Sequence, residues 1–183
     1  IQPFRRLDYQ PSDIFLYIDS EIEYRVRLNS CKKEPETIEW IQKYFQKGDV
    51  FYDIGANVGA YSLVAAKHFD GLVKVYAFEP GFVTYPQLCK NIWLNSAQDS
   101  VVPFQIGLSD ETTVSIFNYS NLESGGALHA LGEPNGQDGV AFKPVFQQQV
   151  LAYKLDDLTE QFGLSFPDHI KIDVDGIEYA ILE

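Results

Sequence analysis

A glycine-rich turn carries the first residues whose types and spacing could do chemistry. Residues 50–54 are β-branched or aromatic apart from Asp53, and Gly55, Asn57 and Gly59 follow at alternate positions. Strand, turn and helix in this order hold nucleotide-like ligands, because glycines admit the ligand to the backbone and the helix start offers free N–H groups. The turn lacks the Gly-x-Gly-x-x-Gly pattern that cradles a pyrophosphate. Its leading acid would repel a phosphate but suits an ammonium or sulfonium cation.

A second acid, Glu79, closes the next predicted strand, residues 73–78. It stands twenty residues beyond Gly59, where folds of this kind place the acid that holds ribose hydroxyls. Together with Asp53 it predicts a cationic adenosyl ligand. Two alternatives stay open. The turn could be an ordinary strand-to-helix connection with structural glycines, or the chain could be an NAD-dependent oxidoreductase, which the glycine spacing disfavours.

Charged residues also interrupt a predicted strand near the end of the chain. Apolar residues alternate over 170–174, while Lys171, Asp173 and Asp175 point the other way. A central strand of a parallel sheet should be apolar on both faces, and violations of local rules tend to mark functional sites. In a doubly wound sheet this fourth strand lies beside the first, at the switch point where ligands bind. Asp53 and Asp173 should then flank one crevice.

Two other interpretations of these charges remain. Lys171 and Asp173 could form an internal pair that only satisfies itself, although buried ion pairs are a poor source of stability. Asp173 and Asp175 could instead supply oxygen ligands to a magnesium ion. Only two carboxylates converge in this arrangement, so we predict no metal site.

The elements that must position these groups alternate between strand and helix. Helices are predicted over 35–48, 58–69 and 85–95, and strands over 50–54, 73–78 and 101–106. Pro35 fits the first helical position, and Pro103 favours an edge strand. Three strands with intervening helices predict a right-handed βαβαβ unit. The fold class is therefore α/β, a Rossmann-like doubly wound and mostly parallel sheet.

Two segments lie outside that unit. Alternating runs at 14–18 and 22–28, separated by a turn, predict an N-terminal β-hairpin, so we divide the chain into an extension, 1–34, and a main domain, 35–183. Strands are also expected at 113–119 and 146–153, and the glycine-rich stretch between them could line a substrate site or form a surface excursion. His129 in this stretch is more typical of a surface histidine than of a base.

Composition limits the class of partner. The chain has 183 residues, which suits about one domain, and a net charge of −12, which argues against a nucleic-acid backbone as partner. The sequence contains no apolar run of membrane-spanning length and no signal-peptide pattern. Two cysteines do not make a disulfide framework, which favours a reducing, cytoplasmic location. With no methionine and an end inside a predicted helix, we expect a fragment.

Five motifs in order resemble the FkbM-type S-adenosylmethionine-dependent methyltransferases, and the similarity extends from about residue 10 to the end. The motifs are Asp53-Ile-Gly-Ala-Asn-Val-Gly59, Ala77-Phe-Glu-Pro80, Leu88 with Asn91 and Asn95, Leu108-Ser-Asp110, and Lys171-Ile-Asp-Val-Asp-Gly-Ile-Glu178. At Asp175 the family usually has Glu, so the carboxylate is kept on a shorter side chain. The resemblance implies a class I methyltransferase sheet of seven strands, of which the fifth to seventh would lie beyond Glu183, a C-terminal truncation.

The resemblance also implies roles for individual residues. Asp53 and the glycine turn would hold the methionine portion of S-adenosylmethionine, Glu79 its ribose, and residues 106–108 its adenine. The implied cofactor-binding set is Asp53, Gly55, Asn57, Gly59, Tyr61, Glu79, Pro80, Gly107 and Leu108. The implied catalytic residues are Asp173, as base or orienting group, Lys171 and Glu178, with Asp175 contacting substrate.

The implied reaction is O-methylation of a hydroxyl on a sugar, glycan or secondary metabolite. The implied partner is therefore a small-molecule or glycan acceptor, with no nucleic acid and no membrane. A magnesium-assisted O-methyltransferase and a non-catalytic adenosyl-binding module remain as alternatives. The sequence does not indicate an oligomeric state.

Overall fold

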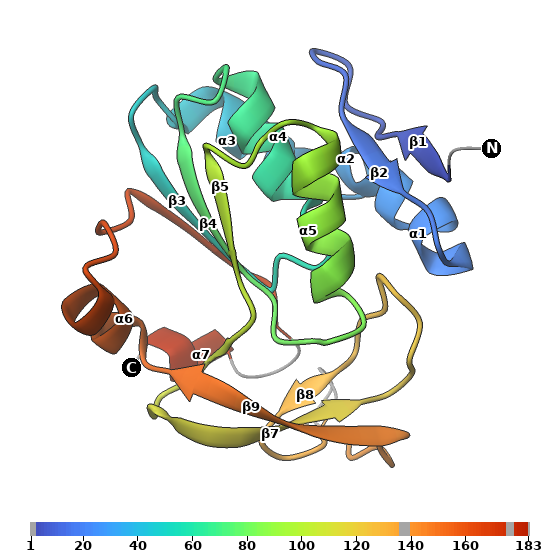
Figure 1. Ribbon diagram of the computed structural model, residues 1–183, viewed down its shortest axis with the longest axis vertical. Helices are drawn as coiled ribbons and strands as arrows, with labels where there is room; N and C mark the ends of the chain where they lie inside the picture. The colour runs from blue at the N-terminus through green and yellow to red at the C-terminus, as the bar shows by residue number, and fades with distance from the viewer. Residues whose placement is uncertain (1–2, 136–139, 175–177, 183) are drawn as a thin grey trace.

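A computed structural model describes residues 3–135, 140–174 and 178–182, and its centre is a parallel sheet with strand order β10-β3-β4-β5 (Figure 1). The strands are β3 (Val50–Ile54), β4 (Lys74–Phe78), β5 (Val101–Phe104) and β10 (His169–Ile172). The predicted fourth strand does lie beside the first, with Lys171 opposite Asp53. Pro103 lies on β5, which is an edge of this sheet as predicted.

Two hydrophobic cores cover the two faces of this sheet. Helices α3 (Pro35–Tyr44), α4 (Ala60–His68) and α5 (Tyr85–Leu94) lie on one face, and α6 (Leu155–Phe162) and α7 (Glu178–Leu182) contribute to the core of the other. Because successive side chains of a strand point to opposite faces, Phe51 belongs to the first core and Tyr52 to the second. Helix α3 ends at Tyr44, earlier than predicted, because Phe45 turns into extended backbone and stacks on His169.

An N-terminal hairpin exists and the run 14–18 contains one of its strands, but the predicted partner strand is wrong, because the true partner precedes that run. Strand β1 (Phe4–Arg6) pairs antiparallel with β2 (Phe15–Tyr17), whereas residues 22–28 are not a strand. They fall in α1 (Glu21–Arg25) and a 3₁₀ helix (Arg27–Asn29), followed by α2 (Ser30–Lys33). The reason is local. Ser20 caps α1 and Glu23 caps in return, a reciprocal box that outweighs the alternating pattern.

The hairpin is attached to the main domain through both polar and apolar contacts. Asn91 of α5 and Asn95, which caps the end of this helix, accept hydrogen bonds from the backbone N–H groups of Tyr17 and Phe15 respectively, each at 2.8 Å. These side chains provide hydrogen-bond acceptors for backbone N–H groups at the free edge of β2, as a neighbouring strand would. Leu16 lies in the same core as the buried residues of α4. The boundary after residue 34 stays a prediction.

Replacing Ser20 with alanine tests the cap of α1. Ser20 Oγ accepts from the Glu23 N–H at 3.0 Å and donates to the Ser124 carbonyl at 2.7 Å. Loss of an N-cap side chain costs about 1 kcal/mol, and loss of the second hydrogen bond adds to that. We expect the free energy of unfolding in urea to fall by about 1–2 kcal/mol. A variant as stable as the parent would show that α1 does not depend on this cap.

A second sheet packs across the end of the first (Figure 1). Its strand order is β6-β9-β7-β8, made of β6 (Gly107–Leu108), β7 (Thr113–Tyr119), β8 (Ala130–Leu131) and β9 (Phe146–Tyr153). The two predicted strands, β7 and β9, are confirmed and pair antiparallel with each other. No helix in the described ranges is long and apolar enough to cross a membrane.

Candidate functional site

A cavity of about 400 Å³ opens at the carboxyl ends of β3 and β4. Its walls come from the glycine turn after β3, the Glu79–Pro80 step after β4, the segment Ile106–Leu108, and part of the glycine-rich stretch, Gly126–His129. Asp173 completes the wall beside the turn. Ligands of open α/β sheets bind in this position, so the cavity is the candidate site. Of the predicted cofactor residues it includes Gly55, Asn57, Glu79, Pro80, Gly107 and Leu108.

The glycine turn is shaped by a close approach of β10. Gly55 has φ +77°, and a Cβ at this position would overlap the carbonyl oxygen of Asp173. Gly59, with φ +85°, lies against Leu88 of α5 and not in the cavity wall, where a Cβ would come within 2.5 Å of Leu88 Cδ1. Both positions therefore favour glycine for conformation, and Gly55 requires it for space as well, because the atom it approaches belongs to the backbone. The turn brings the ends of β3 and β10 together.

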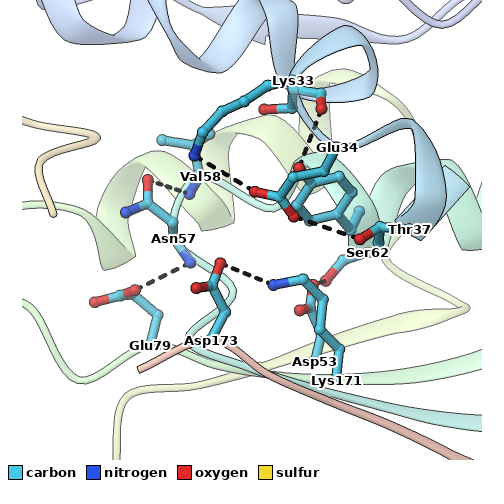
Figure 2. A network of polar contacts seen from close by, with 12 residues as sticks. Lys33, Glu34, Thr37, Asp53, Asn57, Val58, Ser62, Glu79, Lys171 and Asp173 are labelled. Atoms are coloured by element: carbon cyan, nitrogen blue, oxygen red, sulfur yellow. Dashed lines mark hydrogen bonds and ion pairs between the residues drawn. The ribbon is translucent and has the colours of Figure 1, made fainter. Parts of the chain in front are cut away.

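Glu79 holds the turn in place with its carboxylate. Oε2 accepts the Asn57 N–H at 3.0 Å and Oε1 accepts the Gly81 N–H at 2.8 Å, and the side chain is buried (Figure 2 shows the first contact). Burial raises the pKa of Glu79 to about 7, against the lowering effect of these backbone hydrogen bonds and of Arg27. Each carboxylate oxygen can accept a further hydrogen bond, so the group can still bind ligand hydroxyls.

Asp53 lies behind the turn rather than in the cavity wall. Its side chain is completely buried, and Oδ2 accepts the Ser62 hydroxyl of α4 at 2.5 Å. Oδ1 has no hydrogen-bond partner among the described residues. Burial raises the pKa of Asp53, with Lys171 and Ser62 acting in the opposite direction. A direct contact between Asp53 and the cofactor stays a prediction.

Lys171 and Asp173 form an ion pair beside the turn (Figure 2), and Lys171 also contacts the ring of Tyr61. Lys171 Nζ lies 2.9 Å from Asp173 Oδ2 and 4.9 Å from the centre of the Tyr61 ring. The lysine side chain is only 10% exposed, whereas that of Asp173 is 56% exposed. Tyr61 donates to the Ser30 carbonyl at 3.1 Å, and burial raises its pKa. The aspartate is thus held by a buried cation but open to a ligand. Neither Lys171 nor Tyr61 lines the cavity.

The N-terminal extension supplies cavity residues that sequence reasoning missed. Arg27, Lys33 and Glu34 line the same cavity as Asp173. Arg27 falls within residues 22–28, which the alternating pattern predicts as a strand, and the helical structure of this segment overturns that prediction. A capping box, Ser20 followed three residues later by Glu23, was the sequence signal that could have revealed the helix.

The remaining predicted residues have mixed outcomes. Glu178 begins α7 and is not part of the cavity wall. Asp175 lies outside the described residues. His129 is partly buried in the cavity wall, and burial lowers its pKa to about 4. It is therefore not an ordinary surface histidine.

The pKa of Glu79 leads to a prediction about pH. Because that pKa is raised, the carboxyl group gains a proton as pH falls through about 7, and a protonated carboxyl can no longer accept from two hydroxyls with both oxygens equally. S-adenosylhomocysteine affinity should fall by up to about tenfold per pH unit below that point. The Glu79→Gln variant should bind S-adenosylhomocysteine more weakly than the parent at pH 8, and its affinity should not change with pH in this way. Calorimetric titrations at pH 6, 7 and 8 measure both.

The exposed Glu123 gives the matched control for this experiment. Glu123→Gln removes the same group from the glycine-rich stretch without touching the cavity wall, so it should keep the parent's affinity and pH slope. A Glu79→Gln variant that behaves like Glu123→Gln would show that the acid of the second strand does not contact ligand.

The fold and the cavity define a Rossmann-like α/β domain with a ligand site at the carboxyl ends of its parallel strands. The profile of the Methyltransferase FkbM domain matches residues 53–183. The chain belongs to this family of methyltransferases, whose cofactor is S-adenosylmethionine.

Two relatives and a solved structure are similar to the chain. It is 24% identical over 157 residues to the hexuronic acid methyltransferase AglP of Haloferax volcanii, covering 86% of this chain and 58% of that protein. It is 28% identical over 153 residues to the methyltransferase sdnD of Sordaria araneosa, covering 72% and 58%. The crystal structure of methyltransferase FkbM from Methylobacillus flagellatus KT is 17% identical, with a TM-score of 0.48 over 75% of this chain and 29% of that one. The chain thus spans little more than half the length of the two relatives.

Proposed function

We propose that this chain is the cofactor-binding part of an S-adenosylmethionine-dependent O-methyltransferase that acts on a hydroxyl group of a sugar, glycan or secondary metabolite. One observation carries the proposal. A single cavity joins the glycine turn, the Glu79 carboxylate and residues 106–108 to Asp173, at the carboxyl ends of neighbouring parallel strands. The name of one relative, a hexuronic acid methyltransferase, supports a sugar acceptor.

The residues present fit the cofactor. Glu79 is a buried acceptor with lone pairs left for ribose hydroxyls, and Gly55 brings the backbone close because no Cβ fits there. Oδ1 of Asp53, for which the described residues offer no hydrogen-bond partner, lies behind this turn and favours positive charge nearby. Glu79 would hold the ribose, Gly55 and Asn57 the methionine portion, and Gly107 and Leu108 the adenine. Asp53, Gly59 and Tyr61 would support the turn from behind.

The chemistry divides between cofactor and protein. The bound cofactor supplies a methyl group on a sulfonium, which is already an activated leaving group. The protein must therefore mainly align the acceptor and receive its hydroxyl proton. Asp173 is the residue that we assign to this proton, because its carboxylate is open to the cavity. Lys171 would hold Asp173 in place, and Glu178 and Asp175 would contact or orient the acceptor.

The proposal also covers the class of acceptor and the cellular compartment. The net charge of −12 fits an acceptor other than nucleic acid. Cys31 and Cys89 are free thiols, which fits a reducing compartment such as the cytoplasm. The small-molecule or glycan acceptor is then a cytoplasmic one.

Transfer of a labelled methyl group tests the proposal. The full-length protein is incubated with S-adenosylmethionine labelled in its methyl group and with methyl glycosides of neutral and uronic sugars. Label should move to at least one sugar hydroxyl, and the product should lose it on ether cleavage but not on mild ester hydrolysis. Binding of the cofactor without transfer to any hydroxyl would favour a non-catalytic module. Activity that disappears with a chelator would favour the magnesium-assisted alternative.

A further inference from the structure

Arg27 brings a cation into the cavity, and no carboxylate of the described ranges pairs with it. Its Nε–H donates to the Gly125 carbonyl at 2.8 Å, and one terminal N–H lies 3.4 Å from the Gly126 carbonyl. The other N–H groups of the guanidinium have no partner among the described residues, and Arg27 lines the cavity wall. A guanidinium offers five N–H donors in a planar fork. Several of them thus remain available to a ligand.

The neighbouring lysines differ from Arg27 in this respect. Lys33 lies 3.4 Å from Glu34 Oε1, and Lys171 lies 2.9 Å from Asp173 Oδ2. Arg27 forms no ion pair with any described residue; Asp173 and Glu79 act on it only at longer range, and burial lowers its pKa. A partly buried cation without a partner is costly. An anionic ligand that enters the cavity would remove this cost.

We propose that Arg27 is a binding site for a carboxylate of the ligand. This inference rests on the proposed function, which supplies two sources of that group: the amino-acid end of the cofactor, and the acid of a uronic sugar. A planar carboxylate matches the guanidinium fork. A doubly charged phosphate would meet Asp173 and Glu79 nearby and is disfavoured by repulsion.

A purely structural role for Arg27 is the competing explanation. The Gly125 and Gly126 carbonyls belong to the glycine-rich stretch that forms one cavity wall, so Arg27 could serve only to fix that wall. Loss of such a fixing contact would weaken every ligand of the cavity alike. Loss of a carboxylate site would weaken only ligands that carry a carboxylate. Pairs of ligands that differ in this group separate the two explanations.

The test compares S-adenosylhomocysteine with 5′-methylthioadenosine, which lacks the amino-acid carboxylate, and methyl glucuronide with methyl glucoside. Binding to the full-length protein is measured by calorimetry for the parent, for Arg27→Gln and for Arg25→Gln. Glutamine keeps an N–H donor for the Gly125 carbonyl. Arg25 is the matched control, because it lies on α1, pairs with Glu21 and does not line the cavity.

In one pair, the ligand with the carboxylate should bind Arg27→Gln about 10- to 100-fold more weakly than it binds the parent, as expected for a lost charge-assisted hydrogen bond. The affinity for the analogue without the carboxylate should not change. The affected pair identifies the source. Arg25→Gln should change neither pair. Equal weakening of both members, or no change in either pair, would overturn the proposal. If the parent binds neither adenosyl ligand, the proposed function fails, and the sugar pair still tests Arg27.

Discussion

Asp173→Asn is expected to lower the turnover of the full-length protein by about 10²–10⁴-fold, the loss typical of a missing general base. The affinity for S-adenosylhomocysteine should stay near that of the parent. Asparagine keeps the shape of the side chain and an oxygen that can accept a hydrogen bond from the Lys171 ammonium group. It cannot take a proton from the hydroxyl of the methyl acceptor. Initial rates of labelled methyl transfer, with calorimetry on the same preparations, measure both quantities.

The structural alternative for Asp173 predicts a different pattern. If the pair with Lys171 only stabilises the fold, Asp173→Asn should reduce stability and leave turnover per folded molecule unchanged. The pair is half exposed on the aspartate side, so this loss should be about 1 kcal/mol or less. Asp19→Asn is the matched control, since Asp19 is similarly exposed and pairs with Lys90 at 3.2 Å. A fully active Asp173→Asn enzyme would remove Asp173 from the mechanism.

Gly55→Ala is expected to abolish binding of S-adenosylhomocysteine and to destabilise the fold. A left-handed backbone at φ +77° costs alanine about 1–2 kcal/mol. The added Cβ would also overlap the Asp173 carbonyl oxygen, which is backbone and cannot rotate away. Relief requires the ends of β3 and β10 to separate, and this moves Asp173 relative to the turn. Thermal unfolding and calorimetry below the unfolding transition measure the two effects.

Gly163→Ala provides the control for backbone strain alone. Gly163 has φ +64° and open space where a Cβ would lie, so its substitution should cost only the conformational term of about 1–2 kcal/mol. S-adenosylhomocysteine binding should not change, because Gly163 ends α6 away from the cavity wall. If Gly55→Ala resembled Gly163→Ala in both stability and binding, the close approach of β10 would have no role in the site.

Much of the fold could be predicted because its signals are local. The run at 50–54 and the glycines after it specify a buried strand and a turn, and the order of strands and helices specifies a parallel sheet. Placement of the last strand beside the first then followed from topology alone. This is why the nearness of Asp173 to Gly55 could be expected from sequence.

The segment 22–28 shows where such reasoning fails. Its residues alternate as in a strand, but the backbone is helical because Ser20 and Glu23 cap each other. Buried Glu23 also accepts hydrogen bonds from Gln87 and Ser124, which lie far away in the sequence. Tertiary partners of this kind have no local pattern. The position of Arg27 in the cavity wall could not be predicted from the sequence, because it depends on these tertiary partners.

In the candidate site, too, some residues could be predicted from local sequence and others could not. Glu79 could be assigned to the site because it ends a strand at the required distance from the turn. The burial of Asp53 behind the turn could not be predicted from the sequence, because it depends on how α4 brings Ser62 against the strand. The wall formed by Gly126–His129 depends on the second sheet, whose pairing joins strands separated by a long glycine-rich stretch.

Calorimetric titration of the full-length protein with S-adenosylhomocysteine and with NAD tests the central claim, that this cavity holds an adenosyl sulfonium cofactor. We predict one-site binding of S-adenosylhomocysteine that is lost in Gly55→Ala, and no measurable binding of NAD. Binding of NAD without binding of S-adenosylhomocysteine would contradict the account.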